Sequence, residues 1–299
     1  MSKIKICLGI YGMQNYFGGD LGGLIDSIAE AERAGFDQVS MTDHVVMGER
    51  TDRYPFGPWQ SPLNWPWYEP IALLSAIAAR TKTIRLSTGV LISPLRPAVL
   101  LGKQLATLDV ISKGRVDIGI GVGWQEEEYI ASGIPFEGRY TRMMEQVRVW
   151  RKQWSEEKVS VNESTVKFDN IWSHPQPVQG KNLPVWFGVA ASPINCKRIA
   201  EVGDGWIPIS LDPKIVAEGV NDIKAAFSAA GRDPKTLDVR VQVMPQFNAD
   251  GSGDLERTLD GLAAMVEAGA TMLEVLPIIF CRSPDEIGKF YERVAKLKA

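Results

Sequence analysis

The chain has 299 residues, of which 45% are hydrophobic and 23% are charged, so it contains enough apolar material to bury a large core. Its 33 basic and 36 acidic residues give a formal charge of −3 and form no basic stripe, which argues against nucleic acid as a partner. No apolar run approaches membrane-spanning length, and the N-terminus does not have the pattern of a signal peptide.

Cysteine and histidine usage excludes two further classes of protein. Cys7, Cys196 and Cys281 are odd in number and have no paired spacing, which predicts reduced core thiols and neither a disulfide framework nor a zinc site. With His44 and His174 as the two histidines, no histidine-based metal centre is expected. We therefore expect a cytoplasmic protein with no metal site and no membrane partner.

Strand-like and helix-like segments alternate along the chain. The expected strands are Ile4–Ile10, Gln38–Thr42, Ile84–Leu91, Arg115–Val122, Pro184–Gly188, Gly205–Ile209, Val239–Met244 and Met272–Leu276. The expected helices lie near 21–34, 70–80, 97–112, 140–155, 193–202, 214–230, 254–268 and 284–298. This pattern predicts an α/β fold, a single (β/α)8 TIM-barrel domain over residues 1–299, with a doubly wound open sheet as the alternative.

Residues at the helix ends support this division. Glycines that suit a left-handed residue after a helix precede three strands, at Gly35, Gly203 and Gly269. A capping side chain followed by proline begins three helices, at Ser192-Pro193, Asp212-Pro213 and Ser283-Pro284. Ser283 with Glu286 also has the spacing of a capping box.

Two insertions enlarge the barrel, one at 45–69 after the second strand and one at 156–182 after the fourth helix, with strand-like pieces around Val159–Val166. The first insertion leaves at the functional face of the barrel and combines prolines with Tyr54, Phe56, Trp59, Trp65, Trp67 and Tyr68. Proline stiffens such a loop and the aromatic rings supply apolar area. We expect a roof over a substrate pocket that includes Trp59, Trp65 and Trp67; a subunit contact is an alternative compatible with it.

Residues 115–124 form an unusual expected strand. One face carries Val116, Ile118, Ile120 and Val122, and the other carries Asp117, Gly119, Gly121 and Gly123. Glycines in a strand indicate close approach of a ligand or of another part of the backbone. A bulge or a tight contact with a helix is the alternative, and spacing alone leaves both explanations open.

Other strand ends carry groups that could do chemistry, because active sites of such barrels lie at the C-terminal ends of the strands. The second strand ends at Asp43-His44, a pair that could orient a ligand or move a proton, or could belong to an ordinary turn. The third ends with small residues at Thr88-Gly89-Val90. The segment Ala190–Ser192 precedes a proline-started helix and suits a phosphate, although simple capping by Ser192 explains it as well. Together these ends predict a slot for a flat aromatic ring attached to a phosphate.

Several chemistries are excluded. The chain has no Gly-x-Ser-x-Gly elbow, no phosphate-binding loop of the nucleotide triphosphatases, and no glycine spacing of the dinucleotide-binding folds. Glu126, Glu127 and Glu128 are expected to begin a solvated helix, and His174 is expected to be structural.

The chain resembles the luciferase-like monooxygenase superfamily of flavin and deazaflavin oxidoreductases over nearly its whole length. The stretches that carry the resemblance are Leu105-Ala-Thr-Leu-Asp109, Gly114-Arg-Val116, Gly121-Val-Gly-Trp124, Ile134-Pro-Phe-Glu137 with Arg139, Gly203-Asp-Gly-Trp206, and Asp43-His44. The Asp-His form is similar to the branch that uses the 5-deazaflavin coenzyme F420.

The resemblance implies a TIM barrel with the cofactor ring in its mouth, His44 close to the redox face, and a cis peptide at Gly89-Val90 behind the ring. Asp43 would hold the ring or tune His44, and Ala190, Ala191 and Ser192 would bind phosphate. The cofactor-binding residues implied are Asp43, His44, Thr88, Gly89, Val90, Gly121, Gly123, Trp124, Ala190, Ala191 and Ser192. Some deazaflavin sugar-phosphate dehydrogenases place a catalytic glutamate where this chain has Trp124, so the same acid–base scheme and phosphorylated substrate are not expected.

The main hypothesis is an F420-dependent oxidoreductase that transfers a hydride between the deazaflavin and a fairly apolar small-molecule substrate, with His44 and Asp43 as catalytic residues. The first alternative is an FMN-dependent monooxygenase, a flavoprotein with the same fold. The second is a redox-inactive binding or accessory subunit, with Trp124 folded into the ring slot. A homodimer is expected because relatives dimerise through barrel helices.

Overall fold

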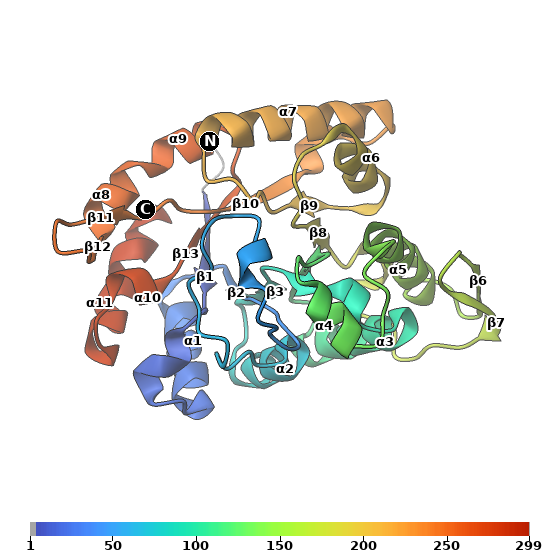
Figure 1. Cartoon of the computed structure of the whole chain (residues 1–299), viewed down its shortest axis with the longest axis horizontal. Helices are drawn as coiled ribbons and strands as arrows, with labels where there is room; N and C mark the ends of the chain where they lie inside the picture. The colour runs from blue at the N-terminus through green and yellow to red at the C-terminus, as the bar shows by residue number, and fades with distance from the viewer. Residues whose placement is uncertain (1–3, 299) are drawn as a thin grey trace.

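The computed structural model describes residues 4–298 and consists of a parallel barrel with helices around it (Figure 1). The strands of the ring, in pairing order, are β1 (Lys5–Gly9), β2 (Gln38–Met41), β3 (Arg85–Thr88), β5 (Val116–Gly121), β8 (Val185–Phe187), β9 (Gly205–Trp206), β10 (Asp238–Gln242) and β13 (Met272–Val275). Strand β13 pairs with β1 and β3 pairs with β5, so the ring is closed and the prediction of a (β/α)8 barrel is confirmed. The open-sheet alternative is wrong.

The predicted third strand is interrupted after Thr88, and its last part is a separate short strand, β4 (Leu91–Ile92), which pairs with β5. The peptide bond between Gly89 and Val90, in the gap, is cis, as the family resemblance implied. The ends of β3 and β4 therefore bring the segment Thr88–Val90 to the C-terminal mouth of the barrel.

Helices follow the strands as expected. They are α1 (Leu21–Ala34), α2 (Pro70–Arg80), α3 (Ala98–Ser112), α5 (Arg139–Gln153), α6 (Pro193–Val202), α7 (Pro213–Ala229), α8 (Leu255–Asp260), α9 (Leu262–Glu267) and α11 (Pro284–Ala295). The helix predicted at 254–268 is divided at Gly261, a residue with low helix propensity. The short helix α4 (Glu126–Ala131) begins at the glutamates that were expected to start a helix. The short helix α10 (Pro277–Phe280) was not predicted, because so few turns give no readable periodicity.

The structure confirms most of the predicted helix ends and corrects two. Ser192 and Asp212 cap α6 and α7, and Gly35 and Gly269 are left-handed, with φ of 104° and 101°. Gly203, by contrast, is extended, with φ of −90°. Glycine is needed at this position because a larger residue would not fit: a Cβ there would lie 2.9 Å from the ring of Phe187.

The predicted capping box at Ser283 is wrong. The Ser283 side chain caps no N–H, and Glu286 accepts its hydrogen bond from the backbone N–H of Arg282 at 2.6 Å. The carboxylate therefore closes the turn one residue earlier than the capping-box pattern requires.

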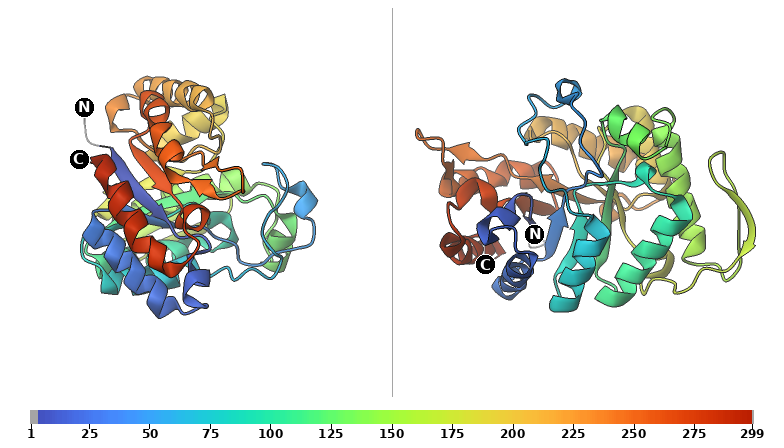
Figure 2. Two further views of the ribbon diagram at one scale, coloured as in Figure 1. Left: turned by 90° about the vertical axis from the view of Figure 1, so that its left-hand side faces the viewer. Right: turned by 60° about the horizontal axis from the view of Figure 1, so that its bottom comes forward.

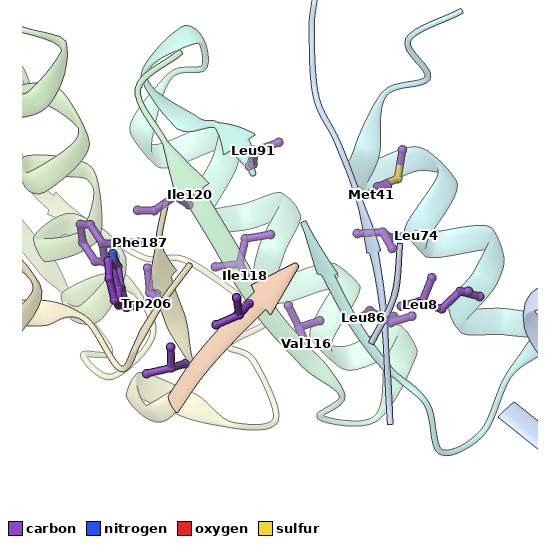
Figure 3. Packing of buried hydrophobic residues seen from close by; sticks show 14 of the residues in the cluster. Leu8, Met41, Leu74, Leu86, Leu91, Val116, Ile118, Ile120, Phe187 and Trp206 are labelled. Atoms are coloured by element: carbon purple, nitrogen blue, oxygen red, sulfur yellow. The ribbon is translucent and has the colours of Figure 1, made fainter. Parts of the chain in front are cut away.

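The core lies between the ring and its helices. Val116, Ile118 and Ile120, the predicted apolar face of β5, are all fully buried and pack in one cluster with Leu86 and Phe187 (Figure 3). This cluster fixes the orientation of β5, so that its glycine face points into the barrel.

The two insertions leave the barrel at different places. Residues 45–69 project beyond the barrel beside α4 (Figure 2). The second insertion contains an antiparallel hairpin of β6 (Val159–Asn162) and β7 (Lys167–Ile171), as its strand-like pieces suggested. A further small hairpin, β11 (Gln246–Phe247) with β12 (Gly253–Asp254), was not predicted.

Glu145 of α5 fastens the turn of the β6–β7 hairpin to the barrel. Its carboxylate is 3% exposed and accepts hydrogen bonds from the backbone N–H groups of Ser164 and Thr165, at 3.0 and 2.8 Å, and from both hydroxyls. Burial raises the pKa of Glu145, but these hydrogen bonds lower it by more, so the net shift is downward. A lowered folded-state pKa gives a stabilisation that is present above the unfolded pKa and is lost as pH falls through the folded pKa.

We expect Glu145→Gln to reduce the free energy of unfolding by about 1–3 kcal/mol at neutral pH, because a charged acceptor of several hydrogen bonds is lost. The difference from the wild type should shrink in urea titrations as the pH falls, because the carboxylate of Glu145 then binds a proton in the folded state as well as in the unfolded state. Glu157→Gln, at an exposed position just after α5, is the control and should change neither value. An equal loss of stability in the two variants at neutral and at acid pH would contradict the stabilising role of the Glu145 carboxylate.

Candidate active site

His44 lies just beyond β2, at the mouth of the barrel, and is 9% exposed. Its Nδ1 is 3.2 Å from Oε2 of Glu128 on α4, and the Glu128 side chain is fully buried. The other oxygen of Glu128 accepts the backbone N–H of Val45 at 2.5 Å. An ionised carboxylate only accepts hydrogen bonds, so Nδ1 carries a proton and Nε2 is left as the nitrogen that can exchange one.

Glu128 corrects the prediction of a solvated run of glutamates. Glu126 is exposed as predicted and pairs with Arg53 at 3.0 Å, whereas Glu128 points inward. Three adjacent glutamates do not indicate which one turns inward, and the partner of Glu128 lies 84 residues away in the sequence. No local signal could therefore have identified it.

Asp43 does not face His44. Its carboxylate accepts the backbone N–H of Ile92 at 2.9 Å and both terminal nitrogens of Arg96, at 2.7 and 3.0 Å. Burial lowers the pKa of Arg96, but the hydrogen bonds and charge of Asp43 raise it by more. The ion pair ties the end of β2 to the segment that follows β4, and among residues 4–298 it is Glu128 that hydrogen-bonds His44.

Aromatic rings from the first insertion and from the end of β5 cover His44, and we call Tyr54, Trp59, Trp67 and Trp124 the aromatic roof. The ring centroids of Trp67, Trp59 and Trp124 lie 4.7, 5.7 and 6.2 Å from that of His44. Tyr54 packs on Trp59 and Trp124, at 5.0 and 5.2 Å. Two of the three predicted pocket tryptophans therefore lie at His44, and Trp124 joins them from the end of β5.

The third pocket tryptophan, Trp65, stacks on Tyr11 with ring centroids 5.3 Å apart. Tyr11 follows β1 and its hydroxyl also bonds the hydroxyl of Ser61. Gln125, which is fully buried, fastens the first limb of the same loop: its side-chain amide accepts the N–H of Gly48 at 2.9 Å and donates to the carbonyl of Gly48 at 3.0 Å. Sequence reasoning missed both anchors, because neither residue type is diagnostic in a loop.

The glycine face of β5 makes room for the protein itself. A Cβ on Gly119 would lie 2.1 Å from the carbonyl oxygen of Thr88, and one on Gly121 would lie 2.6 Å from Cγ2 of Val90. A Cβ on Gly188 would likewise lie 2.5 Å from Cγ1 of Val90. Of the two explanations left open by the spacing, close approach of neighbouring chain is the one found here, and the surface offered at this point of the mouth is the partly exposed Val90.

The segment before α6 has free donors. The Ser192 hydroxyl accepts the N–H of Asn195 at 3.4 Å, so it serves as a cap, and Asn195 holds the carbonyl of Ala190 at 2.9 Å. The backbone N–H groups of Ala190 and Ala191 have no acceptor within the described residues. Together with the positive end of α6 they form a suitable seat for an anion.

Two cavities lie at opposite ends of the barrel. One of about 30 Å³, beside the roof loop, is lined by Tyr11, Thr42, Trp65 and Trp67 among others and has space for little more than a water molecule. One of about 590 Å³ lies at the N-terminal end among the ion pairs Lys5–Asp238, Arg85–Asp117 and Lys298–Asp37. The larger cavity is therefore remote from His44, and the candidate site is the partly covered mouth of the barrel.

Two negative findings complete the description. Residues 4–298 contain no group of three or more histidine, cysteine, aspartate or glutamate side chains placed to hold a metal ion. In the same part of the chain, no helix has the length and apolar character needed to cross a bilayer.

Comparison with known proteins identifies the family of the chain. An uncharacterized protein of Mycobacterium tuberculosis is 36% identical over 227 residues, which is 76% of this chain and 75% of that protein. The F420-dependent glucose-6-phosphate dehydrogenase of Kineococcus radiotolerans is 30% identical over 283 residues, covering 92% of this chain and 78% of the enzyme. The structure of the coenzyme F420 dependent tetrahydromethanopterin reductase of Methanopyrus kandleri superposes with a TM-score of 0.77 at 19% identity over 99% of this chain and 98% of that one. A family model described as luciferase-like monooxygenase matches residues 7–275, and the chain belongs to this family.

Proposed function

We propose that the protein is an F420-dependent oxidoreductase that transfers a hydride between the deazaflavin and a fairly apolar organic substrate. The observation that carries the proposal is the His44–Glu128 pair, buried under the aromatic roof at the mouth of the barrel. Support for the cofactor comes from the Kineococcus relative, which is named as F420-dependent and aligns with 92% of this chain.

The residues at the mouth fit such a cofactor. The free N–H groups of Ala190 and Ala191 would hold a phosphate, and Val90 offers an apolar surface for a ring. The indole N–H groups of Trp59, Trp67 and Trp124 are buried without acceptors in residues 4–298, so a bound molecule with oxygen atoms would satisfy them. Asp43 would act through Arg96 and Ile92 as a support of the mouth.

When bound, the deazaflavin would itself carry the hydride. Glu128 keeps a proton on Nδ1 of His44, so the imidazole gives or takes a proton at Nε2, at the reacting atom of the substrate. The aromatic roof excludes water from this point, which strengthens the electrostatic interaction between His44 and the substrate. The same rings would select a substrate with an apolar body.

An FMN-dependent monooxygenase is the second candidate, because the matching family model is one of monooxygenases. Titration of the purified protein with F420 and with FMN, followed by absorbance and tryptophan fluorescence, separates the two. We expect saturable binding of F420 and at least about tenfold weaker binding of FMN, a difference of about 1.4 kcal/mol. Tight FMN binding without F420 binding would favour the second candidate, and failure of both would favour a redox-inactive subunit.

A further inference from the structure

An ion pair lies inside the barrel below the mouth. The Arg240 side chain, from β10, is fully buried, and its guanidinium donates to Oε1 of Gln38, the hydroxyl of Ser87 and the carbonyl of Thr88, at 2.6, 2.8 and 2.8 Å. Its Nε lies 3.4 Å from Oε2 of Glu274, on β13. Arg240 is thus held from several sides, and its guanidinium faces the carboxylate of Glu274.

Polar atoms around this ion pair lack hydrogen-bond partners. Nε of Arg240 and the hydroxyl of Ser40, a residue that is 1% exposed, have none in the described part of the chain. The Glu274 carboxylate has the ion pair with Arg240 as its one polar side-chain contact among residues 4–298. Buried polar groups normally have hydrogen-bond partners, so the lack of partners at these three residues needs an explanation.

Glycines make room for these groups at the ends of the strands. Oε1 of Glu274 is 3.1 Å from the point where a Cβ on Gly9 would lie and 3.7 Å from the corresponding point on Gly89. The Ser40 hydroxyl is 2.7 Å from that same point on Gly89. The carboxylate therefore lies where β1 and β3 end, next to the Gly89-Val90 segment, and its side chain is 12% exposed.

We propose that Glu274 accepts a hydrogen bond from an N–H group of the redox ring bound in the mouth and, by its negative charge, favours the protonated form of that ring. The proposal rests on the proposed function, because the ring is that of its cofactor. Arg240 is a positioning residue: it fixes the carboxylate and, through the carbonyl of Thr88, the segment before Val90.

The other groups around Glu274 do not replace it in this role. Burial, and the charge of Glu274, raise the pKa of the Cys7 thiol on β1, so the thiol stays neutral. Asp117 on β5 lies at the far end of the barrel, where it pairs with Arg85 and accepts a hydrogen bond from the side-chain amide of Gln38. Glu274 is thus the carboxylate of this group that reaches the mouth.

The test is a pH titration of the reduced cofactor bound to the protein, followed by its absorbance. We expect the apparent pKa of the bound ring to be about one unit lower in Glu274→Gln than in the wild type, because removal of a nearby negative charge favours the deprotonated ring. Glu267→Gln, an exposed position on α9, should leave this pKa unchanged. Equal pKa values in the wild type and Glu274→Gln overturn the proposal for Glu274 and leave the proposed function standing, whereas a wild type that binds no cofactor overturns both.

Glu274→Gln leaves Arg240 without its counter-charge, so thermal unfolding must accompany the titration. If that variant does not fold, Glu274→Asp keeps the charge and withdraws it from the mouth by one methylene group. We then expect a smaller decrease of the ring pKa, about half a unit. An unchanged pKa in Glu274→Asp overturns the proposal.

Discussion

Replacement of His44 by alanine is expected to lower kcat by about 10²- to 10⁴-fold, the usual contribution of a positioned acid or base. The affinity for the cofactor should change little, since the phosphate seat and Val90 lie on other segments, between β8 and α6 and between β3 and β4. Steady-state kinetics with a substrate found by screening, together with a cofactor titration, measure both quantities. Undiminished turnover in His44→Ala would show that this histidine is not the group that handles the proton.

Glu128→Gln tests the role of the negative charge of Glu128, because it keeps the size of the side chain. The amide has the same shape but removes the charge that holds the proton on Nδ1 of His44, so a loss of about 10- to 100-fold is expected, with a shifted pH profile. Glu126→Gln on the same helix is the matched control, because Glu126 is exposed and pairs with Arg53. Equal kinetics and pH profiles in the two variants would refute the role of Glu128.

Asp43→Asn is expected to lower the free energy of unfolding by about 3–5 kcal/mol, because it leaves the charge of Arg96 without its buried partner. The side chains of Asp43 and Arg96 are 1% and 12% exposed, so water compensates little. Urea denaturation of the variant gives the value directly. The value measures the contribution of Asp43 to stability, while its role beside the cofactor stays a prediction.

Glu69→Gln is the matched control, because Glu69 pairs with the same guanidinium at 3.2 Å but is 46% exposed. Its effect on stability should stay below about 1 kcal/mol, as for exposed ion pairs generally. Comparable losses in the two variants would mean that burial does not distinguish the two carboxylates.

The barrel could be predicted because each of its units carries its own local signals. Left-handed glycines at Gly35 and Gly269 and capping residues at Ser192 and Asp212 are decided within one or two helical turns. Gly203 has the same sequence context but serves to admit the ring of Phe187, a contact that only the folded chain creates. Local rules identify where a helix ends, whereas the reason for a particular glycine can be tertiary.

The candidate site was only partly predictable for the same reason. The place of His44 follows from the rule that functional groups lie at strand ends, and the structure puts it at the mouth. The family resemblance implied that Asp43 holds the ring or tunes His44, whereas the hydrogen bond to His44 comes from Glu128 on another element. Which of the two buried carboxylates contacts His44 depends on packing across the barrel, and adjacency in the sequence does not report it.

The roles of Trp59, Trp65 and Trp67 in substrate binding, of Ala190–Ser192 in phosphate binding, and the homodimer stay predictions. Contacts in the structure distinguish the three tryptophans from one another. Trp59 and Trp67 contact His44, whereas Trp65 belongs to the anchor at Tyr11. A variant at Trp65 should therefore act through the position of the loop, and variants at Trp59 and Trp67 through direct contact with the bound molecule.

The two anchors of the roof loop determine how a molecule can enter. Gln125 holds Gly48 and Tyr11 holds Ser61, so the chain between them forms a flap whose ends stay in place when its tip swings away. Opening would separate the ring of Trp59, which lies within the flap, from His44 and break the exposed Arg53–Glu126 pair, which contributes little. The gate is thus governed by apolar contact, and the rate of entry should be nearly independent of ionic strength.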